Sequence, residues 1–414
     1  MVSAVPRVAT LDVIRGVAVM GILLMNIVAF AMPDVAYMNP AAFGSHNAVD
    51  YGVWAVNFVL VDSKMRGLFS FLFGASMLLV IERAEAKGES PLRVHYARMF
   101  WLLVFGFAHL YFIWWGDILH HYALVGMIAF AFRKMPPHQL AIAALILIGL
   151  ETALAFTLVQ DIAQSQAAVA AHHADAATLK SYREYVEAFG RPDQATLAKD
   201  IAAHRGGYAA VFADRLRLAM VLPQQTLMFV GMETLGFMLL GMACFKTGML
   251  SGEWARARYR RWATVGFGLG IPAYVALAVL QWRGGFDAYW VALCTIALAT
   301  PFRPLMIVGW ACLIVLLARP GGALTARFGA AGRMAFSNYL GTSLICSTLF
   351  YGYGGGLYGH LSRAELYLVV AAIWVLMLLW SKPWLAHFRY GPFEWLWRSL
   401  ARWKLQPMHG AAGD

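Results

Sequence analysis

The stretch Gly106–Gly126, GFAHLYFIWWGDILHHYALVG, decides the fold of this chain. Its pattern predicts the outer end of one membrane helix, a tight turn and the start of the next helix. Trp114 and Trp115 precede the turn, as expected for tryptophans at a membrane–water boundary. Ionisable side chains inside apolar helices are costly, and they usually face the protein interior or a wet cavity. This corner is therefore the candidate functional site, because it holds four of them: His109, Asp117, His120 and His121.

The composition indicates a polytopic membrane protein. Of 414 residues, 61% are hydrophobic and only 13% are charged, and the mean hydropathy is +0.61. Soluble proteins are about 45–50% apolar and about 25% charged. The apolar residues form repeated runs of roughly 20 residues, which is long enough to cross a bilayer. We therefore predict an all-α fold with residues 1–414 in a single integral membrane domain.

The net charge of +11 raises the question of nucleic acid binding. The basic residues gather instead in short links between the apolar runs, which is the positive-inside pattern of membrane proteins. The four cysteines lie inside apolar runs without metal-ligand spacing. We therefore expect neither a nucleic acid partner nor a metal site.

The order of apolar runs and basic links predicts about ten transmembrane helices with both termini cytoplasmic. The first span is expected at 11–32, and an outer amphipathic part near 51–65 should precede the second. Residues 160–222 are expected to form an extracytoplasmic, mostly helical insertion, and residues 382–414 a cytoplasmic amphipathic tail. Two prolines interrupt the run 286–318. One broken span is favoured there, and two short spans would give eleven and place the tail outside.

His109 is the leading candidate for chemistry. Within a predicted span over 100–115 it would lie about 16 Å deep, near the middle of the apolar layer. A neutral histidine there acts either as a general base or as a structural hydrogen-bond donor. Asp117 is either an N-cap or a reactive group. The two are about 12 Å apart along a continuous helix, so they pair only if the helix breaks at Gly116. We therefore expect the partner of His109 on another span, at Glu233, Asn26 or Asn338.

Other polar side chains fall within or beside the apolar runs. Glu233 should be protonated, paired with a cation such as Arg66, or in contact with water. Asp12 and Arg15 share a helix face, which predicts an ion pair. The Asn338-Tyr339 pair either joins helices through hydrogen bonds or binds substrate, and His121 is either interfacial or part of the site. The candidate catalytic residues are His109, Asp117 and Glu233, and the candidate binding residues are Asp12, Arg15, Asn26, Arg66, His121, Arg333, Asn338 and Tyr339.

Several motifs occur in order along the whole chain. They are Leu11-Asp12-x-x-Arg15-Gly16, Leu68-Phe69-Ser70-x-Leu72-Phe73-Gly74, His109 with Gly116-Asp117-Ile118-Leu119, Gly332-Arg333-Met334-Ala335-x-Ser337-Asn338-Tyr339, Phe350-Tyr351-Gly352 and Gly391-Pro392-x-Glu394-Trp395. Together they resemble the YeiB family of bacterial inner-membrane proteins, which is defined by a domain of unknown function. Ser337 departs from the threonine expected there, but it keeps a hydroxyl. The opening motif is also distantly similar to that of transmembrane acyltransferases, an analogy at the level of the fold.

The resemblance implies a multi-pass protein of the bacterial inner (plasma) membrane. The resulting hypothesis is a membrane acyltransferase that moves an acyl group from a cytoplasmic acyl-CoA to an acceptor in or across the membrane. Acyl-CoA would be a co-substrate near Arg15 and Arg333, and no cofactor would be permanently bound. The expected partners are membrane lipids, a lipid or glycan acceptor and, in an alternative assembly, a second copy. A transporter or lipid-handling protein without catalysis, or a membrane scaffold, is the alternative.

Overall fold

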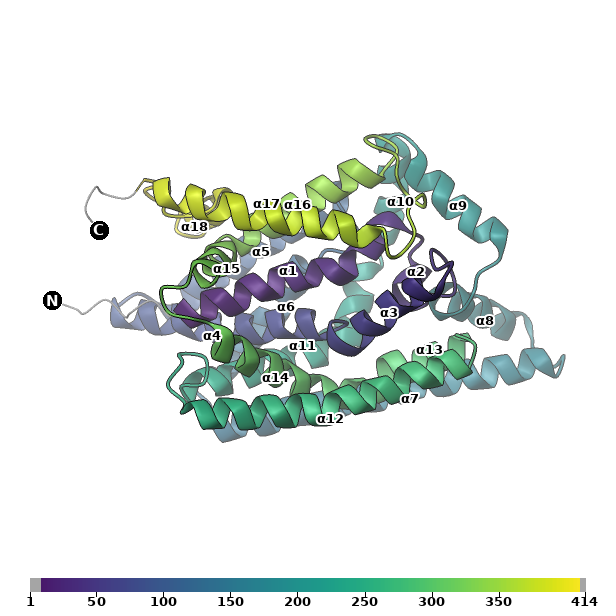
Figure 1. Cartoon of the computed structure of the whole chain (residues 1–414), viewed down its shortest axis with the longest axis horizontal. Helices are drawn as coiled ribbons and strands as arrows, with labels where there is room; N and C mark the ends of the chain where they lie inside the picture. The colour runs from purple at the N-terminus through teal and green to yellow at the C-terminus, as the bar shows by residue number, and fades with distance from the viewer. Residues whose placement is uncertain (1–8, 410–414) are drawn as a thin grey trace.

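The computed structural model describes residues 9–409 of the chain as a bundle of helices (Figure 1). Within those residues the only β contact is an isolated bridge between Phe388 and His409, so the all-α prediction is confirmed. The helices are α1 Ala9–Ala31, α2 Val35–Met38, α3 Ala48–Leu60, α4 Lys64–Ala86, α5 Pro91–Phe112, α6 Leu119–Ala129, α7 Pro137–Ala170, α8 Ala176–Phe189, α9 Gln194–Arg205, α10 Tyr208–Ala219, α11 Leu222–Lys246, α12 Arg256–Arg283, α13 Ala288–Ala292, α14 Arg303–Leu317, α15 Ala323–Arg333, α16 Ala335–Phe350, α17 Leu366–His387 and α18 Pro392–Ala401.

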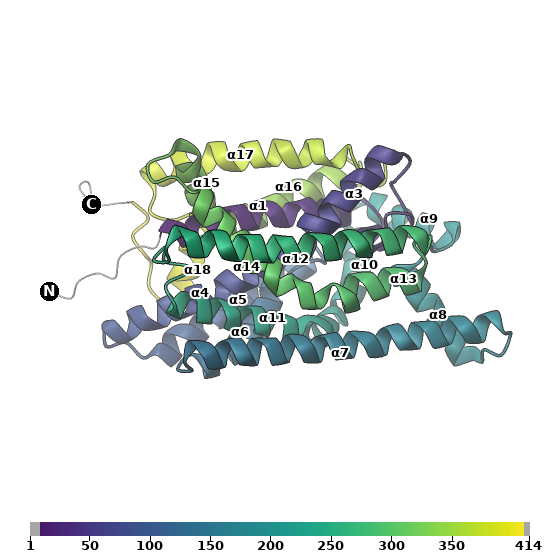
Figure 2. The same ribbon diagram turned by 60° about the horizontal axis from the view of Figure 1, so that its bottom comes forward.

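Seven helical segments among the described residues are long and apolar enough to cross a membrane. Helix α1 begins at the end of the bundle where α17 finishes and α18 lies, and α8 and α9 lie at the opposite end (Figure 1). Helix α7 extends along one edge of the bundle and continues beyond it towards α8 (Figure 2). The protein is therefore a multi-pass helical membrane protein. The cytoplasmic location of the α1 start stays a prediction from the basic links.

Two of the candidate spans are broken. Residues 48–86 form one apolar segment of 39 residues, but the chain turns between α3 and α4, where Ser63 has a left-handed backbone with φ of 57°. In the segment 288–317, a π-helical turn over Leu293–Leu298 and a 3₁₀ turn over Thr300–Phe302 separate α13 from α14. The second break coincides with the prolines that predicted an interrupted run. Both breaks lie beside buried charged side chains, described below.

Close helix crossings at glycines bring the polar side chains together. A Cβ on Gly74 of α4 would lie 2.0 Å from the Met238 carbonyl oxygen of α11, and one on Gly241 would lie 1.8 Å from that of Phe71. A Cβ on Gly106 of α5 would lie 2.2 Å from the His120 backbone nitrogen of α6. Small residues allow such backbone contact in membrane helix pairs. The three glycines thus hold α4 against α11, and α5 against α6.

The glycine-rich loop 351–359 joins the end of α1 to α9. The Gly359 N–H donates to the Ala31 carbonyl oxygen (2.7 Å), and the Gly352 N–H donates to that of His204 (2.9 Å). The Tyr358 ring stacks on His204 at 4.3 Å, and His204 Nδ1 lies 2.8 Å from Asp200 Oδ1. Asp34, just beyond α1, has an oxygen that is buried without a hydrogen-bond partner among the described residues.

These acidic and basic groups make the loop contact sensitive to pH. Burial, reinforced by the charge of Asp200, raises the pKa of Asp34 to about 7. Burial disfavours the charged form of His204, but the hydrogen bond to Asp200 and its charge outweigh that effect and raise the His204 pKa. A folded-state pKa above the unfolded value means that the folded protein binds the proton more tightly. Both groups therefore stabilise the fold at acidic pH, and the Asp34 part is lost as the pH rises through about 7.

We expect the melting temperature of the purified protein to fall as the pH rises from about 4 to about 7, the range between the unfolded and folded pKa values of Asp34. Asp34→Asn should reduce this fall, because asparagine does not titrate. Asp175→Asn is the matched control: Asp175 is exposed and hydrogen-bonded to the backbone N–H of Thr178, and its pKa is lowered, so it should leave the slope unchanged. An unaltered pH dependence in Asp34→Asn would assign the effect to another group.

Candidate functional site

The corner between α5 and α6 contains a buried carboxylate that bridges two histidines. Asp117 Oδ2 lies 2.7 Å from His109 Nδ1, and Asp117 Oδ1 lies 2.8 Å from His120 Nδ1. The backbone N–H of His120 also donates to Asp117 Oδ1 at 2.9 Å, so Asp117 caps the start of α6 as well. His109 and His120 are each 1% exposed. Asp117 thus both caps a helix and orients two imidazoles.

The expectation that another span supplies the partner of His109 is wrong, because the helix does break and His109 pairs with Asp117. Helix α5 ends at Phe112, three residues after His109, and the chain then folds back before α6. The helix starts at Pro91, so His109 lies near its end and not at its middle. Trp114 is not an interfacial anchor either, since it is 2% exposed and its ring stacks on Phe30 at 3.9 Å.

The bridge determines which histidine nitrogens remain available. Because Nδ1 of each ring faces Asp117, a neutral ring donates that proton and keeps its Nε2 lone pair. Nε2 of His109 and of His120 are both buried, with no hydrogen-bond partner among the described residues. A carboxylate-oriented imidazole with a free Nε2 is the arrangement of a general base. Within residues 9–409 no group of three or more His, Cys, Asp or Glu side chains is placed to hold a metal ion.

A cavity of about 460 Å³ lies beside this corner, a size typical of ligand pockets. Its walls are mostly apolar side chains of α4, α5 and α16, with Ile118 and Tyr122 of the α6 region. Its arginines are Arg15, Arg83, Arg98, Arg333, Arg389 and Arg398. Tyr339 lines the cavity, and its ring lies 5.3 Å from that of His109. His109 is therefore one side chain behind the cavity wall.

A second, more basic cavity of about 870 Å³ adjoins the first, and we call it the basic vestibule. Arg83, Arg98, Tyr390 and Arg398 line both. The vestibule adds further charged residues, of which only one is acidic: Lys87, Glu89, Arg93, Arg402 and Lys404. Together the two cavities offer a cationic part and an apolar part to one ligand.

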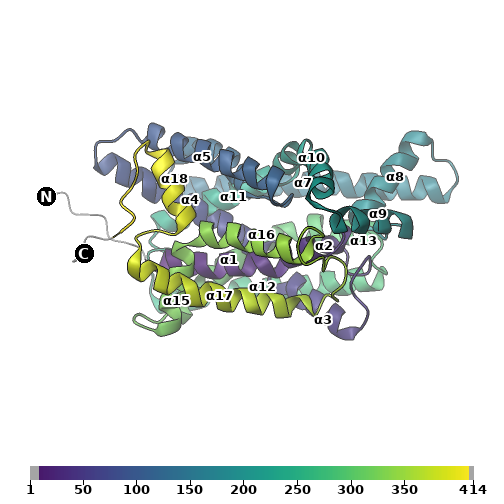
Figure 3. The ribbon, with the colours of Figure 1, turned by 90° about the horizontal axis from the view of Figure 1, so that it is seen from above.

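Helix α18 contributes Arg398 to both cavities, and a carboxylate fixes this helix in place. Figure 3 shows α18 lying across one end of the bundle. Glu394 accepts hydrogen bonds from the N–H groups of Phe336 (2.7 Å) and Ser337 (3.1 Å) at the start of α16, and from the Ser337 hydroxyl. Glu394 therefore supplies the N-terminal cap of α16 from another helix. The hydroxyl that this chain retains at Ser337 takes part in that contact.

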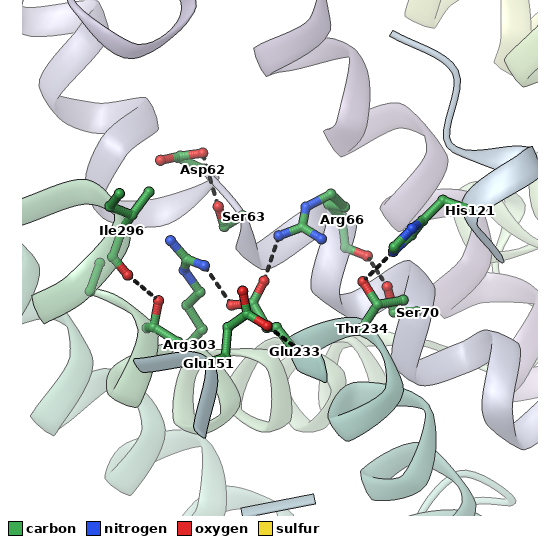
Figure 4. Close-up of polar contacts among 12 residues, drawn as sticks. Asp62, Ser63, Arg66, Ser70, His121, Glu151, Glu233, Thr234, Ile296 and Arg303 are labelled. Carbon is green, nitrogen blue, oxygen red and sulfur yellow. Dashed lines mark hydrogen bonds and ion pairs between the residues drawn. The ribbon is translucent and has the colours of Figure 1, made fainter. Parts of the chain in front are cut away.

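Glu233 lies in a different cluster and does not contact His109. Its carboxylate accepts from Arg66 at 2.6 Å and from Arg303 at 2.5 Å (Figure 4). Of the three alternatives for Glu233, the structure shows pairing with Arg66, and it adds Arg303 as a second partner that the sequence did not indicate. His121 faces this cluster, with Nε2 3.0 Å from the Thr234 hydroxyl. His121 is fully buried, so the interfacial interpretation of this residue is wrong.

The other candidate binding residues separate into cavity residues and helix contacts. Asp12 and Arg15 line the cavity and form the expected ion pair at 3.2 Å, and Arg15 also donates to the Ser76 hydroxyl. Arg333 lines the cavity and donates to the Arg389 carbonyl oxygen. Asn338 instead joins helices, because it bonds to Ala331, Trp380 and Ser381. Asn26 is half-buried on α1, and its side chain has no hydrogen bond within residues 9–409.

Sequence reasoning missed Glu151, Arg98 and Arg303. Glu151 is an isolated carboxylate in an apolar run, which is the same signal that singled out Glu233. Arg303 lies between the prolines of the broken run and was treated only as part of the interruption. Arg98 belongs to a basic link by its sequence, and nothing local predicts that it lines a cavity.

Comparisons with known proteins find similar sequences along nearly the whole chain. A family model described as "Protein of unknown function (DUF418)" matches residues 244–404. The uncharacterized protein YeiB of Escherichia coli strain K12 is 33% identical over 405 residues, covering 95% of this chain and 96% of the relative. The uncharacterized protein YxaH of Bacillus subtilis strain 168 is 32% identical over 411 residues, covering 97% and 96%. No solved structure matches the chain. The chain belongs to the YeiB family.

We expect Asp117→Ala to be much more destabilising than Asp117→Asn. Alanine removes the α6 cap and leaves two buried imidazoles without their partner, a loss of about 3–5 kcal/mol. Asparagine keeps an oxygen acceptor for the His120 N–H and loses mainly the charge. Thermal unfolding of the detergent-purified variants measures the difference. Asp175→Ala is the control, because it removes an exposed helix cap outside this site. Equal stability of the two Asp117 variants would show that the hydrogen bonds from Asp117 to His109 and His120 do not stabilise the fold.

Proposed function

We propose that this protein is an acyltransferase of the bacterial plasma membrane. It would take an acyl group from a cytoplasmic acyl-CoA and pass it to a hydroxyl or amine acceptor in or across the membrane. The observation that carries this proposal is the pair of adjoining cavities, which is basic at the vestibule, apolar further in, and bounded by Tyr339 in front of His109. An acyl-CoA has the complementary shape, with anionic phosphates at one end and an apolar chain at the other.

The vestibule supplies phosphate-binding groups of the appropriate kind. Arg98 stacks over the Trp397 ring at 4.1 Å and Arg398 over the Tyr390 ring at 4.6 Å, so each guanidinium is held in place by an aromatic face. Arginine binds phosphate through charge-assisted, often bidentate hydrogen bonds. The apolar side chains of α4 and α5 would then take the acyl chain.

Acyl transfer needs one proton removed and one returned. His109 Nε2 would accept the proton of the acceptor O–H or N–H while the acceptor atom attacks the thioester carbonyl. Collapse of the tetrahedral intermediate would break the C–S bond, and the leaving CoA thiolate would take the proton from His109. Asp117 would hold the imidazole in the required tautomer and stabilise its charged form.

Tyr339 would have to move for His109 to reach a ligand in the cavity. Its hydroxyl accepts from the Ile118 N–H at 3.4 Å, which is longer than a typical hydrogen bond of 2.7–3.2 Å. A small rotation of this side chain would open the wall between His109 and the cavity. Tyr339 is accordingly proposed as a gate.

The position of His109 behind that wall also supports a second candidate, a transporter or lipid-handling protein that binds an amphipathic anion without chemistry. The two candidates share the cavity and differ only in the need for a base. Variants of the vestibule therefore test binding, and variants of His109 test catalysis.

For binding, we expect Arg98→Gln and Arg398→Gln each to weaken palmitoyl-CoA binding about tenfold, or ~1.4 kcal/mol. The reason is the loss of a charge-assisted hydrogen bond to phosphate. Arg260→Gln is the matched control, because Arg260 is exposed on α12 and lines neither cavity. Binding to purified protein is measured by titration at fixed salt. Unchanged palmitoyl-CoA affinity in both vestibule variants would contradict the proposal that the basic vestibule binds the phosphates of acyl-CoA.

For catalysis, we expect wild-type protein to hydrolyse acyl-CoA slowly, with water as a surrogate acceptor. His109→Gln should lower that rate about 10²-fold or more, as loss of a general base does, while glutamine still donates a hydrogen bond to Asp117. The turnover of acetyl-CoA and palmitoyl-CoA is measured by detecting the free CoA thiol that hydrolysis releases. Intact binding with no turnover in either protein would favour the second candidate.

A further inference from the structure

The cluster around Glu233 contains a second carboxylate whose charge nothing in the mechanism above requires. Glu233 itself is 1% exposed and forms ion pairs with two guanidinium groups, those of Arg66 on α4 and Arg303 on α14. Both of its oxygens are occupied by these contacts. An ion pair of this kind keeps a buried carboxylate ionised, because the partners offset its lost hydration.

Glu151 of α7 lies directly beside Glu233 (Figure 4). It is 6% exposed. Its carboxylate makes one hydrogen bond among the described residues, accepting from the Glu233 backbone N–H at a long 3.3 Å. The charged groups that face it are Glu233 from α11, Arg66 from α4 and Arg303 from α14. Within residues 9–409 Glu151 forms no ion pair, since both arginines bind Glu233 instead.

An ionised Glu151 in this position would be costly for two reasons. A carboxylate in an apolar span is stable only when it is paired, hydrated or protonated. A second negative charge beside Glu233 would also be repelled, and carboxyl groups that share a site hold a proton between them. A neutral Glu151 with a single weak hydrogen bond satisfies both constraints.

We propose that Glu151 and Glu233 form a proton-binding site inside the membrane. Glu233 is the fixed anion, and Glu151 binds and releases the proton. This inference is independent of the acyl-transfer proposal, because it uses no residue that lines the two adjoining cavities and requires no acyl donor.

The two arginines give the proton a structural consequence. One buried nitrogen of each has no acceptor among the described residues, namely Nη1 of Arg66 and Nε of Arg303. On losing its proton, Glu151 becomes an acceptor that these nitrogens attract and that Glu233 repels. Proton release therefore favours a different contact between α7 and the arginine pair.

A short polar route leads to the cluster from the broken helix. Arg303 donates to the Thr295 carbonyl oxygen, which the π-helical turn leaves accessible. Thr295 and Asp62 line a small cavity of about 10 Å³, which has room for roughly one water molecule. The Thr295 hydroxyl is buried there without a partner among the described residues. Water in this cavity would bring protons within reach of the site.

Carbodiimide labelling tests the proposal, because dicyclohexylcarbodiimide reacts with protonated carboxyl groups in apolar surroundings. In the purified full-length protein we expect labelling of Glu151, located by peptide mass spectrometry, that falls at least about fivefold as the pH is raised from about 6 to 9. Glu233 should stay unlabelled as the internal control. Glu151→Gln should lose this label, whereas Glu365→Gln, at an exposed position, should keep it.

Infrared difference spectra between the two pH values give a second readout that needs no reagent. A carbonyl band of a protonated carboxylic acid should appear at the lower pH in wild type and be missing in Glu151→Gln. If that variant does not fold, Glu151→Asp keeps the acid and should shift the band. Absence of label on Glu151, equal labelling of Glu233, or a band that survives in Glu151→Gln would overturn the proposal.

Discussion

A carboxylate inside an apolar helix bundle must be hydrogen-bonded, paired with a cation or protonated, and this constraint organises the molecule. Asp117 meets it with two histidines and a backbone N–H. Glu233 meets it with two arginines. Each solution draws together segments that are distant in sequence or separated by a turn, so the polar contacts fix the relative positions of α4, α5, α6, α11 and α14. Apolar helix surfaces can pack against one another in many arrangements, whereas the hydrogen bonds and ion pairs of Asp117 and Glu233 form in few of them.

The same constraint explains why the cavity is basic at one part and apolar at another. Long cationic side chains can keep their charge at a cavity while their stems cover apolar surface. Arg98 and Arg398 line both cavities, each with its guanidinium over an aromatic ring. Further into the bundle the walls carry Phe, Leu and Met side chains of α4 and α5. A ligand that is anionic along its whole length, or apolar along its whole length, would leave one of the two parts unmatched.

The sequence predicted those features that depend on composition and near-neighbour spacing. Apolar runs predicted the helical membrane fold, the prolines predicted the interruption before α14, and spacing on one helix face predicted the Asp12–Arg15 pair. The end of α5 was missed because Phe112, Ile113 and Trp114 are as compatible with a helix as the residues before them. What ends the helix is tertiary: Trp114 stacks on Phe30 of α1, and a Cβ on Gly116 would collide with the Trp114 ring at 2.4 Å. Contacts between distant helices, such as Glu233 with Arg303, leave no trace in local spacing.

Helix α6 connects the two polar clusters. His120 and His121 are consecutive, and consecutive residues of an α-helix point about 100° apart because one turn takes about 3.6 residues. His120 therefore faces Asp117 on one side, while His121 faces Thr234, the neighbour of Glu233, on the other. The helix has only 11 residues, and Gly106 allows its backbone to lie against α5, so both histidines lie on one short element packed between the clusters. A change in the arginine–carboxylate cluster that shifts α11 would be passed through His121 to α6, and hence to the Asp117 bridge that orients His109. Among residues 9–409 no hydrogen bond links the two clusters directly, so α6 is the element that they share.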